Sequence, residues 1–572
     1  MSPQGGDIQR ALFEFSKARS LDENGLQALK RHGANLVRRN RILEDLGITD
    51  TGRQVVTLEE RERWINDHEE QILASAESPI EKSFWREVAS KPMQFLAFCL
   101  AYSQWKEDPQ APIHLPIQID GTCNGLQHIA ALTCDEALAR AVNVLPRAEG
   151  FPGDIYTELS EAAANTLGKL HEINDLKLPK DHRDAILMAD GWLAGVPDGQ
   201  DWLNRETAKK VVMTIPYGAG PKSQATHVLD AIAHQIEKKW KTDTVSTNIE
   251  KWINSNDTSE KYPRSSFRSK CCKGHFKEFR RSAFAGDSNA KTDWNQLRSL
   301  AAYASLAIVY HLRHALSTKY PCVDGFSGWL KEIAKVNSGL PLLWTSPLGF
   351  PVCQDKFRLQ GTSINAQLSG RKIRLDVRHL KEDVAPVKQA SALLPNLIHS
   401  LDATHLALIL LGAKYQNITD VGSIHDCLLC HPNDAVSLGK IVRSTFAGMY
   451  ARKNSALPNP LARWNDWMQL VAKLRDLTDL NLIMGALSYP NDISESLLQQ
   501  KARQGNELAA KSLVFLDEIR KLDPSLQYLM KSLLQYAIDT RLKPRTKETK
   551  FPTLPAGELM ITADSISEYF FS

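Results

Sequence analysis

Two aspartates in this chain stand where a metal site could form. Asp120 ends a stretch, residues 114–120, in which apolar residues alternate with others, as is typical of a strand. Asp426 lies between two short apolar stretches, which predicts a hairpin that turns at this residue. A strand end and a hairpin turn can lie side by side in one sheet, where two converging carboxylates suit two Mg²⁺ ions about 3.5–4 Å apart. Taken singly, each aspartate is more commonly a turn residue or a helix cap.

A second group of residues follows helical spacing. Arg205, Lys209 and Tyr217 lie at intervals of four or eight residues, so a helix over residues 204–215 would place them along one face. Two cations one turn apart suit the β- and γ-phosphates of a nucleotide, and a tyrosine two turns further on reaches its sugar. The alternative is a solvated charged stripe beside a core tyrosine. Pro216 cannot continue the helix and predicts that it ends or kinks just before Tyr217.

The elements that must position these residues are mostly helices. Helical periodicity covers most of residues 7–105, then residues 159–170, 204–215, 294–316, 381–411 and 459–536. Strands are predicted at residues 114–120 and 421–430, with a hairpin-like region at residues 344–377. The fold class that follows is an α-rich α+β protein with a small antiparallel sheet at its centre.

Composition bounds the class of protein. The 572 residues correspond to about four domains, and 43% apolar with 24% charged residues suit a globular chain with a large core. The net charge of +4 is too small to indicate nucleic-acid binding. The nine scattered cysteines show no disulfide framework, and we find neither a signal sequence nor an apolar run of about 18 residues. We therefore expect an intracellular, soluble protein with no membrane partner.

Longer motifs carry a resemblance to a known family. In residues 120–128 (Asp-Gly-Thr-Cys-Asn-Gly-Leu-Gln-His), 205–218 and 425–426, the chain resembles the single-subunit DNA-directed RNA polymerases of the bacteriophage and mitochondrial type. The resemblance extends to residues 2–7, 32–35, 95–99 and 395–402 and returns at the C-terminal tail. It implies a right-hand polymerase fold with palm and fingers, in which the small antiparallel sheet belongs to the palm. It also leads us to expect a phage protein that acts in the cytoplasm of a bacterial host.

The resemblance implies roles for the metal and phosphate ligands. Asp120 and Asp426 resemble the aspartates that bind two Mg²⁺ ions, with the carbonyl of Gly121 as a further ligand. Arg205 and Lys209 resemble the residues that contact the triphosphate. The expected catalytic residues are therefore Asp120, Lys209 and Asp426.

Three more residues resemble nucleotide-binding positions of the family. Tyr217 and His399 resemble the pair that senses the ribose 2′-hydroxyl, and a site that reads a hydroxyl can discriminate strongly against a sugar that lacks it. Tyr156 resembles a residue near the incoming nucleotide, although a core position is at least as plausible for a lone helical tyrosine.

The implied activity is that of a DNA-directed RNA polymerase: template-dependent transfer of ribonucleotides from NTPs to an RNA 3′ end by a two-metal mechanism. The expected partners are a DNA template, the RNA product and NTPs. Because the resemblance begins at Ser2, inside longer members of the family, we also expect a second polypeptide that supplies the N-terminal domain and the thumb. Two alternatives stay open: an inactive or non-catalytic subunit that binds DNA or a partner, and a DNA-synthesising polymerase of the related family.

The same resemblance suggests a division of the chain into five parts. These are residues 1–200 (palm and flanking helices, with the first aspartate), 201–340 (fingers, with the cationic helix and a basic insertion), 341–455 (hairpins and the return to the palm, with the second aspartate), 456–550 (a helical insertion) and 551–572 (a C-terminal palm tail). Within the fingers, the basic residues 264–281 are interleaved with phenylalanines. They are the best local candidate for contact with a nucleic-acid backbone, with a solvated loop as the alternative.

Overall fold

The computed structural model divides the chain into two compact units. Unit 1 comprises Met1–Pro152 and Gly325–Ser572, and unit 2 comprises Gly153–Asp324. The structure describes residues 6–571 except for 50–52, 174–177, 179–181, 196–201, 241–284, 287, 369–370, 425, 451–459, 490–492, 546–549 and 554–560. The basic residues 264–281 therefore lie outside the described residues.

Unit 1 begins with a run of helices, which confirms the helical prediction for this part of the chain. They are α1 (Asp7–Ala11), α2 (Glu23–Leu36), α3 (Arg39–Asp45), α4 (Leu58–Asp67), α5 (Glu69–Glu77), α6 (Phe84–Val88) and α7 (Pro92–Glu107). Local signals set the helix starts. The Asp22 side chain accepts the Gly25 N–H at the start of α2, and Thr57 and Glu60 form a capping box on α4. Pro92 opens α7, where its missing N–H leaves no helical bond unmade.

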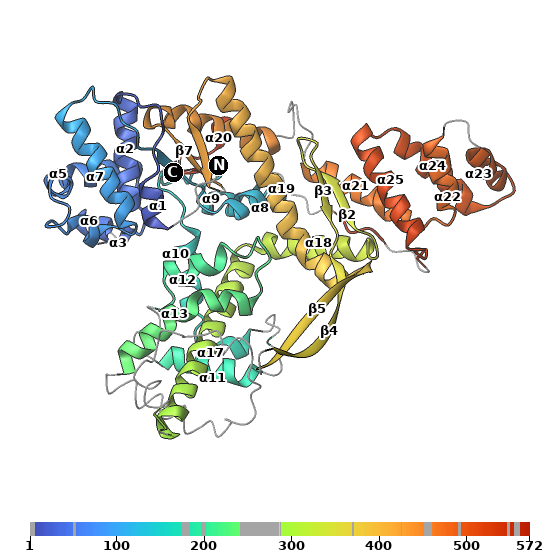
Figure 1. Cartoon of the computed structure of the whole chain (residues 1–572), viewed down its shortest axis with the longest axis horizontal. Coiled ribbons are helices and arrows are strands. Elements are labelled where there is room, and N and C mark those ends of the chain that lie inside the picture. The colour runs from blue at the N-terminus through green and yellow to red at the C-terminus, as the bar shows by residue number, and fades with distance from the viewer. Residues whose placement is uncertain are drawn as a thin grey trace. The chain divides into compact units, whose positions relative to one another are not determined.

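The central sheet of unit 1 is antiparallel and has the strand order β1–β7–β6 (Figure 1). Its strands are β1 (Ile117–Ile119), β6 (Val421–Ile424) and β7 (Cys427–Cys430). In the register, Ile119 lies opposite Leu428, and Ile424 lies opposite Cys427 across the hairpin. The predicted strand and the predicted hairpin therefore form and pair with each other.

Helices around the sheet close the core of unit 1. They are α8 (Asn124–Thr133), α9 (Glu136–Ala141), α19 (Pro386–Tyr415), the short η5 (Pro432–Asp434) and α20 (Ala435–Tyr450). Helix α19 packs against α8 and α20, and α20 also contacts β1. Aromatic rings fill the space between them. Phe446 of α20 lies 4.6 Å from Phe570 of the C-terminal tail and 5.3 Å from His405 of α19, measured between ring centroids.

The remainder of unit 1 consists of further hairpins and helices. They are α18 (Pro321–Val336, mostly in unit 1), β2 (Leu342–Thr345), β3 (Pro351–Gln354), β4 (Phe357–Leu368), β5 (Arg371–Val384), α21 (Pro460–Leu474), α22 (Leu480–Ser488), α23 (Ile493–Arg503), α24 (Glu507–Arg520), α25 (Pro524–Asp539) and η6 (Ala563–Ser565). Strands β4 and β5 form a long two-stranded ribbon (Figure 1). Because β5 runs to Val384, the helix predicted to start at residue 381 starts at Pro386 instead.

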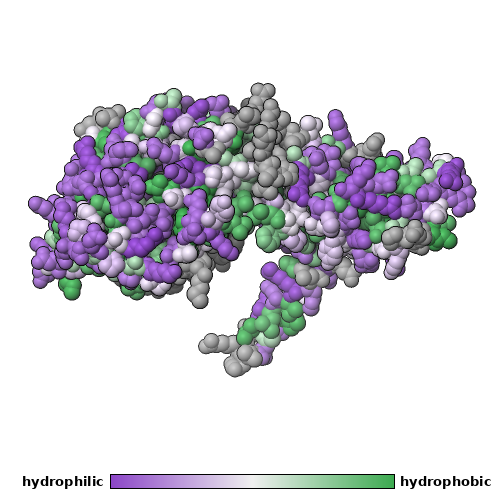
Figure 2. All heavy atoms as spheres, turned by 90° about the horizontal axis from the view of Figure 1, so that it is seen from above, coloured by the Kyte–Doolittle hydropathy of each residue, from purple (hydrophilic) through white to green (hydrophobic). Residues whose placement is uncertain are grey.

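Helix α19 is also the one described helix that is long and apolar enough, by length and composition, to cross a membrane. Its apolar window has a mean hydropathy of 1.3 and is 44% buried within the protein. Leu393, Leu397 and Leu401 are buried in unit 1, and a helix in the core of a folded domain passes the same test. Hydrophilic residues dominate the surface seen in Figure 2, with apolar ones scattered between them.

The described part of unit 2 is helical. It contains α10 (Ile155–Ala164), η2 (Leu170–Glu172), α11 (Arg183–Gly195), α12 (Arg205–Val212), α13 (Pro221–Trp240) and α17 (Ser288–Lys319). Helices α10, α12 and α17 lie near the three that the sequence predicts, whereas α11 and α13 are two further ones that it does not predict. Helix α17 packs against the other four α-helices and carries buried His311, whose Nε2 lies 2.6 Å from Asp190 Oδ1 of α11. Asp190 also accepts the backbone N–H groups of Gly168 and Leu170. Together the two units confirm a helix-rich fold with small antiparallel sheets.

Candidate functional site

The two predicted metal aspartates lie at the same end of the central sheet. Asp120 directly follows β1, and Asp426 directly precedes β7 in the turn of the β6–β7 hairpin. Because Ile119 lies opposite Leu428 in an antiparallel register, Asp120 comes beside Cys427, the neighbour of Asp426. The sheet therefore brings together two carboxylates from distant parts of the sequence.

The thiol of Cys427 is close to both carboxylates. Burial is the largest effect that raises the pKa of Cys427 to about 12, the negative charge of Asp120 comes next, and Asp426 acts in the same direction. Lys91 and Arg10 act in the opposite direction. At neutral pH this thiol is therefore protonated.

The donor chemistry at this end of the sheet fits Mg²⁺. Among the described residues, no group of three or more His, Cys, Asp or Glu side chains could hold a metal ion. Two carboxylates are nevertheless sufficient, because Mg²⁺ is commonly bound by one or two carboxylates together with waters and substrate phosphates. The carbonyl oxygen of Gly121, next to Asp120, is a hard ligand of the same kind.

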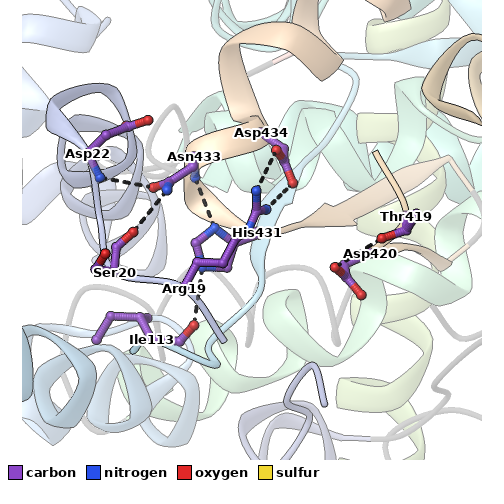
Figure 3. Close-up of polar contacts among 9 residues, drawn as sticks. All are labelled: Arg19, Ser20, Asp22, Ile113, Thr419, Asp420, His431, Asn433 and Asp434. Carbon is purple, nitrogen blue, oxygen red and sulfur yellow. Dashed lines mark hydrogen bonds and ion pairs between the residues drawn. The ribbon is translucent and has the colours of Figure 1, made fainter. Parts of the chain in front are cut away.

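The far end of β7 is attached to the N-terminal part of unit 1 by polar contacts (Figure 3). The guanidinium of Arg19 forms an ion pair with Asp434, and the Asn433 side chain bonds both the carbonyl of Ser20 and the N–H of Asp22. These contacts join η5, which directly follows β7, to the start of α2. They help to fix the strand on which the position of Asp426 depends.

His431, between β7 and η5, joins the same cluster (Figure 3). Its Nδ1 accepts the N–H of Asn433, and its Nε2 lies 3.2 Å from the carbonyl of Ile113. This arrangement requires a neutral ring with the proton on Nε2. Burial first, and then the charge of Arg19, lower the pKa of His431, which favours the same neutral form.

The C-terminal tail holds the loop that follows Asp120. Gly121 forms an antiparallel bridge with Phe571, and the Thr122 hydroxyl donates to the carbonyl of Tyr569 over 3.2 Å. Gln127 of α8 donates to the carbonyl of Phe570 over 3.0 Å. A side chain at position 121 would be tight, because its Cβ would lie 3.1 Å from Gln127 Oε1 and 3.3 Å from the Phe571 ring. Glycine is therefore the residue that allows this close approach.

Helix α8 begins four residues after Asp120 and is linked to its neighbours by buried polar side chains. Nδ1 of the His128 ring forms a hydrogen bond with the Tyr450 hydroxyl of α20 over 2.5 Å. Asn124 Nδ2 donates to Asp402 Oδ1 of α19 over 2.5 Å. These contacts fix the helix that follows the first aspartate.

His399, predicted to sense the ribose, lies on α19 and is exposed. It precedes Asp402 by three residues, so both side chains lie near one face of the helix. The structure places His399 in unit 1 with the aspartates, whereas Arg205, Lys209, Tyr217 and Tyr156 belong to unit 2.

In unit 2, the cationic residues lie on helix α12, whose N-terminus is capped by Asn204. Arg205 is partly exposed and bonds through Nε to Asp154 Oδ2 at 2.9 Å, while Lys209 is also partly exposed. The opposite face of α12 is buried, including Ala208 and Val211. The helical spacing predicted for the two cations is therefore present, and Asp154 is an additional partner that fixes the arginine.

The two tyrosines of unit 2 differ in exposure. Tyr156 is 2% exposed, and the guanidinium of Arg205 lies 5.5 Å from its ring centroid, so this tyrosine belongs to the core beneath the cation. Tyr217 is partly exposed in a turn, because α12 ends at Val212 before Pro216. Contact of either tyrosine with a nucleotide stays a prediction.

Sequence reasoning missed the partners of the candidate residues. The sequence did not predict three contacts: Asp154 with Arg205, Asn124 with Asp402, and the tail residue Phe571 with Gly121. The motifs contain Asn124 and Asp402, but nothing in the order of residues says that these two side chains meet.

Comparisons with known proteins identify the family. The family model described as DNA-dependent RNA polymerase matches residues 19–572. The chain is 27% identical over 451 residues to DNA-directed RNA polymerase 2, chloroplastic/mitochondrial, of Nicotiana sylvestris. It is 29% identical over 451 residues to the mitochondrial DNA-directed RNA polymerase of Schizosaccharomyces pombe, and 26% identical over 454 residues to that of Mus musculus. The chain belongs to the DNA-dependent RNA polymerase family, which confirms the resemblance read from its motifs.

These alignments cover 78% of the chain but only 36%, 32% and 30% of the three relatives. The chain thus spans about a third of their length. The expectation of a phage protein in the bacterial cytoplasm is wrong, because these relatives are named as mitochondrial or chloroplastic polymerases of a plant, a yeast and a mouse. The motifs that carried the resemblance are shared by phage and organellar members and could not separate them.

Proposed function

We propose that this chain is a catalytic region of a DNA-directed RNA polymerase with a right-hand fold, in which unit 1 contributes the palm and unit 2 the fingers. The observation that carries the proposal is the β1–β7–β6 sheet, which brings Asp120 and Asp426 to one sheet end in a member of this family. The reaction is the transfer of ribonucleotides from NTPs to an RNA 3′ end on a DNA template. The five-part division differs from this one for residues 153–200, which belong to unit 2, and for residues 325–340, which belong to unit 1, and it stays a prediction.

In this proposal Asp120, Asp426 and the carbonyl of Gly121 would hold two Mg²⁺ ions. When bound, Mg²⁺ neutralises triphosphate charge and lowers the pKa of a coordinated hydroxyl. The chain itself contributes position. The sheet register sets the distance between the carboxylates, and the bridge between Gly121 and Phe571 holds the loop that carries the carbonyl. Positioning of this kind is the main task of a protein in phosphoryl transfer.

Arg205 and Lys209 would bind the triphosphate. They lie one turn apart on α12, and the buried opposite face of that helix directs them outward. Asp154 takes the Nε–H of Arg205 and exposed Glu206 takes one Nη1–H, which leaves three of the five N–H donors for phosphate oxygens. Asp154 therefore orients the arginine without using all of its donors.

His399 and Tyr217 would read the 2′-hydroxyl of the incoming ribose. A pair of polar groups that is satisfied by this hydroxyl is left unpaired by a deoxyribonucleotide, which gives selection for RNA synthesis. Both side chains are at least partly exposed, as a role in binding substrate requires.

Primer extension on a DNA template tests the proposal. The purified chain is given Mg²⁺ and radiolabelled NTPs, and Asp120→Asn and Asp426→Asn are compared with the unchanged chain. Asn keeps the size and removes the charge, so folding, measured by circular dichroism, should persist. We expect loss of extension by about 10³-fold or more in each variant, as for other groups that stabilise transferring phosphates.

The control is Asp420→Asn, a partly exposed aspartate just before β6 that is placed outside the candidate site. It should extend primers as well as the unchanged chain. Extension by Asp426→Asn at the unchanged rate would overturn the metal assignment. Efficient use of dNTPs would favour the DNA-synthesising alternative, and no extension by the unchanged chain would favour the non-catalytic one. The expected second polypeptide stays a prediction.

A further inference from the structure

Asn124 is the first residue of α8 and links the segment of the first aspartate to another part of the chain. It is 4% exposed, and its Nδ2 donates to Asp402 Oδ1 of α19 over 2.5 Å. The two residues are separated by 278 positions in the sequence. The hydrogen bond to a carboxylate is charge-assisted and stronger than a bond between neutral groups.

This bond is not well explained by stability alone. The second polar atom of the same amide, Asn124 Oδ1, is buried and has no hydrogen-bond partner among the described residues. A buried carbonyl oxygen without a partner is unfavourable and offsets much of what the bond to Asp402 contributes. The unpaired oxygen of Asn124 lowers stability while the amide N–H of the same side chain bonds α19. This combination suggests that Asn124 serves to position α19.

The geometry concerns His399. Asp402 and His399 lie three residues apart on α19, and Asn124 lies four residues after Asp120. The neighbouring part of α19 is attached to the β2–β3 hairpin, because Asn396 donates to Gln354 and Trp344 donates to Ser400. Unlike these contacts, the bond between Asp402 and Asn124 links the part of α19 that carries His399 to the segment of Asp120.

We infer that the Asn124–Asp402 hydrogen bond positions His399 relative to Asp120 and thereby sets how strictly the site selects ribonucleotides. The inference rests on the proposed function, and both residues act through His399, so they are positioning residues. A shift of α19 by a fraction of an ångström moves the imidazole away from the 2′-hydroxyl of a nucleotide bound at Asp120. The discrimination against deoxyribonucleotides then falls, whereas the rate with ribonucleotides falls less.

The test measures kcat/KM for a ribonucleotide and for its 2′-deoxy form in single-nucleotide primer extension. Asn124→Ala is expected to lower the ratio of the two values about tenfold, since one polar contact to a substrate hydroxyl is weakened but not removed. The reciprocal swap, Asn124→Asp with Asp402→Asn, rebuilds an amide–carboxylate bond with its direction reversed and should restore most of the ratio. Asn124→Asp alone places two carboxylates together and should not.

Thr133→Val is the matched control, because Thr133 is also buried on α8 but, among the residues that the structure describes, its side chain bonds within its own helix alone, to the carbonyl of Ile129. It should keep the ratio. An unchanged ratio in Asn124→Ala, or a swap that restores stability but not the ratio, would show that the bond is merely structural.

A second readout separates this inference from the proposed function. Amide hydrogen exchange over residues 396–405 should be faster in Asn124→Ala than in Thr133→Val and return toward the starting rate in the swap. If the unchanged chain extends no primer, the proposed function fails. Amide hydrogen exchange still tests whether the Asn124–Asp402 bond holds α19 in place. Equal exchange in Asn124→Ala and the unchanged chain would overturn the link whatever the activity.

Discussion

The candidate residues of unit 1 and unit 2 are held in place in different ways. In unit 1 the two aspartates meet through strand register, and the surrounding loop and helix are held by the C-terminal tail, α19 and α20. In unit 2 the cations lie one turn apart on a single helix, and the contact that fixes Arg205 comes from Asp154, 51 residues earlier in the sequence. The aspartates therefore meet through the pairing of distant strands, whereas the spacing of the two cations is set within one helix.

This difference predicts where each part is vulnerable. In unit 1, substitutions far from the aspartates in sequence should affect the site as strongly as substitutions next to the aspartates, because strand register and tail contacts depend on the whole fold. In unit 2 the effects should follow the helix face. A substitution on α12 should matter when it faces outward with Arg205 and Lys209, and an exposed neighbour on the same helix should tolerate change.

In unit 2 the largest effect is expected from Lys209→Ala. In the proposed site this variant removes one cation from the triphosphate, which should lower kcat/KM for NTPs by about 10²–10³-fold, because charge on the phosphates is then less stabilised as the bond to the leaving group breaks. Lys210→Ala is the matched control, since Lys210 is exposed on the same helix and is not assigned to the site. Equal losses in the two variants would contradict a specific role for the outward face.

The sequence predicts local features of the site better than the contacts between them. Alternation before Asp120 and the apolar stretches around Asp426 are enough to predict the strand and the hairpin, and both form. Pro216 likewise predicts that α12 ends before Tyr217, and it does. Each of these depends on the conformational preference of a few adjacent residues.

Long-range partners could not be predicted in the same way. The bond between Asn124 and Asp402 depends on how α8 packs against α19, and no periodicity in either helix reports on the other. The extension of β5 to Val384 was also missed, because its pairing with Phe357 overrides the helical pattern there. Tertiary contacts decide both.

Asp154→Asn tests the unit 2 side of the comparison. The side chain of Asp154 is 8% exposed and that of Arg205 is 30% exposed, so loss of the carboxylate leaves a partly buried guanidinium without its buried charged acceptor. We expect a loss of about 1–3 kcal/mol in the free energy of unfolding of unit 2 and roughly tenfold lower kcat/KM for NTPs as Arg205 loses its orientation. Urea denaturation and primer extension measure the two effects.

Glu206→Gln provides the comparison for this variant, because the Glu206 side chain is 74% exposed and also contacts Arg205. A surface ion pair contributes little, so both measurements should stay close to those of the unchanged chain. A Glu206→Gln variant that loses as much activity as Asp154→Asn would contradict the proposed role of Asp154.

Gly121→Ala tests the expectation that the site in unit 1 depends on long-range contacts. The new Cβ would press on the Gln127 side chain and the Phe571 ring, so each of these neighbours must shift by a few tenths of an ångström. We expect a loss of about 1–3 kcal/mol in stability, the range for overpacking, and a fall in primer extension as Asp120 is displaced. Gly191→Ala is the control, because nothing lies within 4 Å of the added Cβ in helix α11. It should stabilise by about 0.5–1 kcal/mol instead.

A pH effect on stability is expected from the buried histidines beside α8. Burial, and for His128 also the nearby His405, lowers the pKa of His128 to about 3, while burial lowers that of His405 to about 4. The unfolded chain has the higher pKa and takes up protons first as the pH falls. The stability that these neutral rings contribute is therefore complete above about pH 6.5 and is lost as the pH falls toward 4, by up to about 1.4 kcal/mol per histidine and pH unit.

Urea denaturation at pH 7.0, 6.0 and 5.0 measures this loss. His405→Gln keeps a donor for the carbonyl of Val442, which the His405 ring contacts through Nε2, and removes the titrating group. Its stability should therefore fall less steeply than that of the unchanged chain. Exposed His114→Gln should keep the original slope, because His114 lies outside this core. If His405→Gln loses stability with falling pH as steeply as the unchanged chain, groups other than the buried histidine rings around α8 cause the acid sensitivity of unit 1.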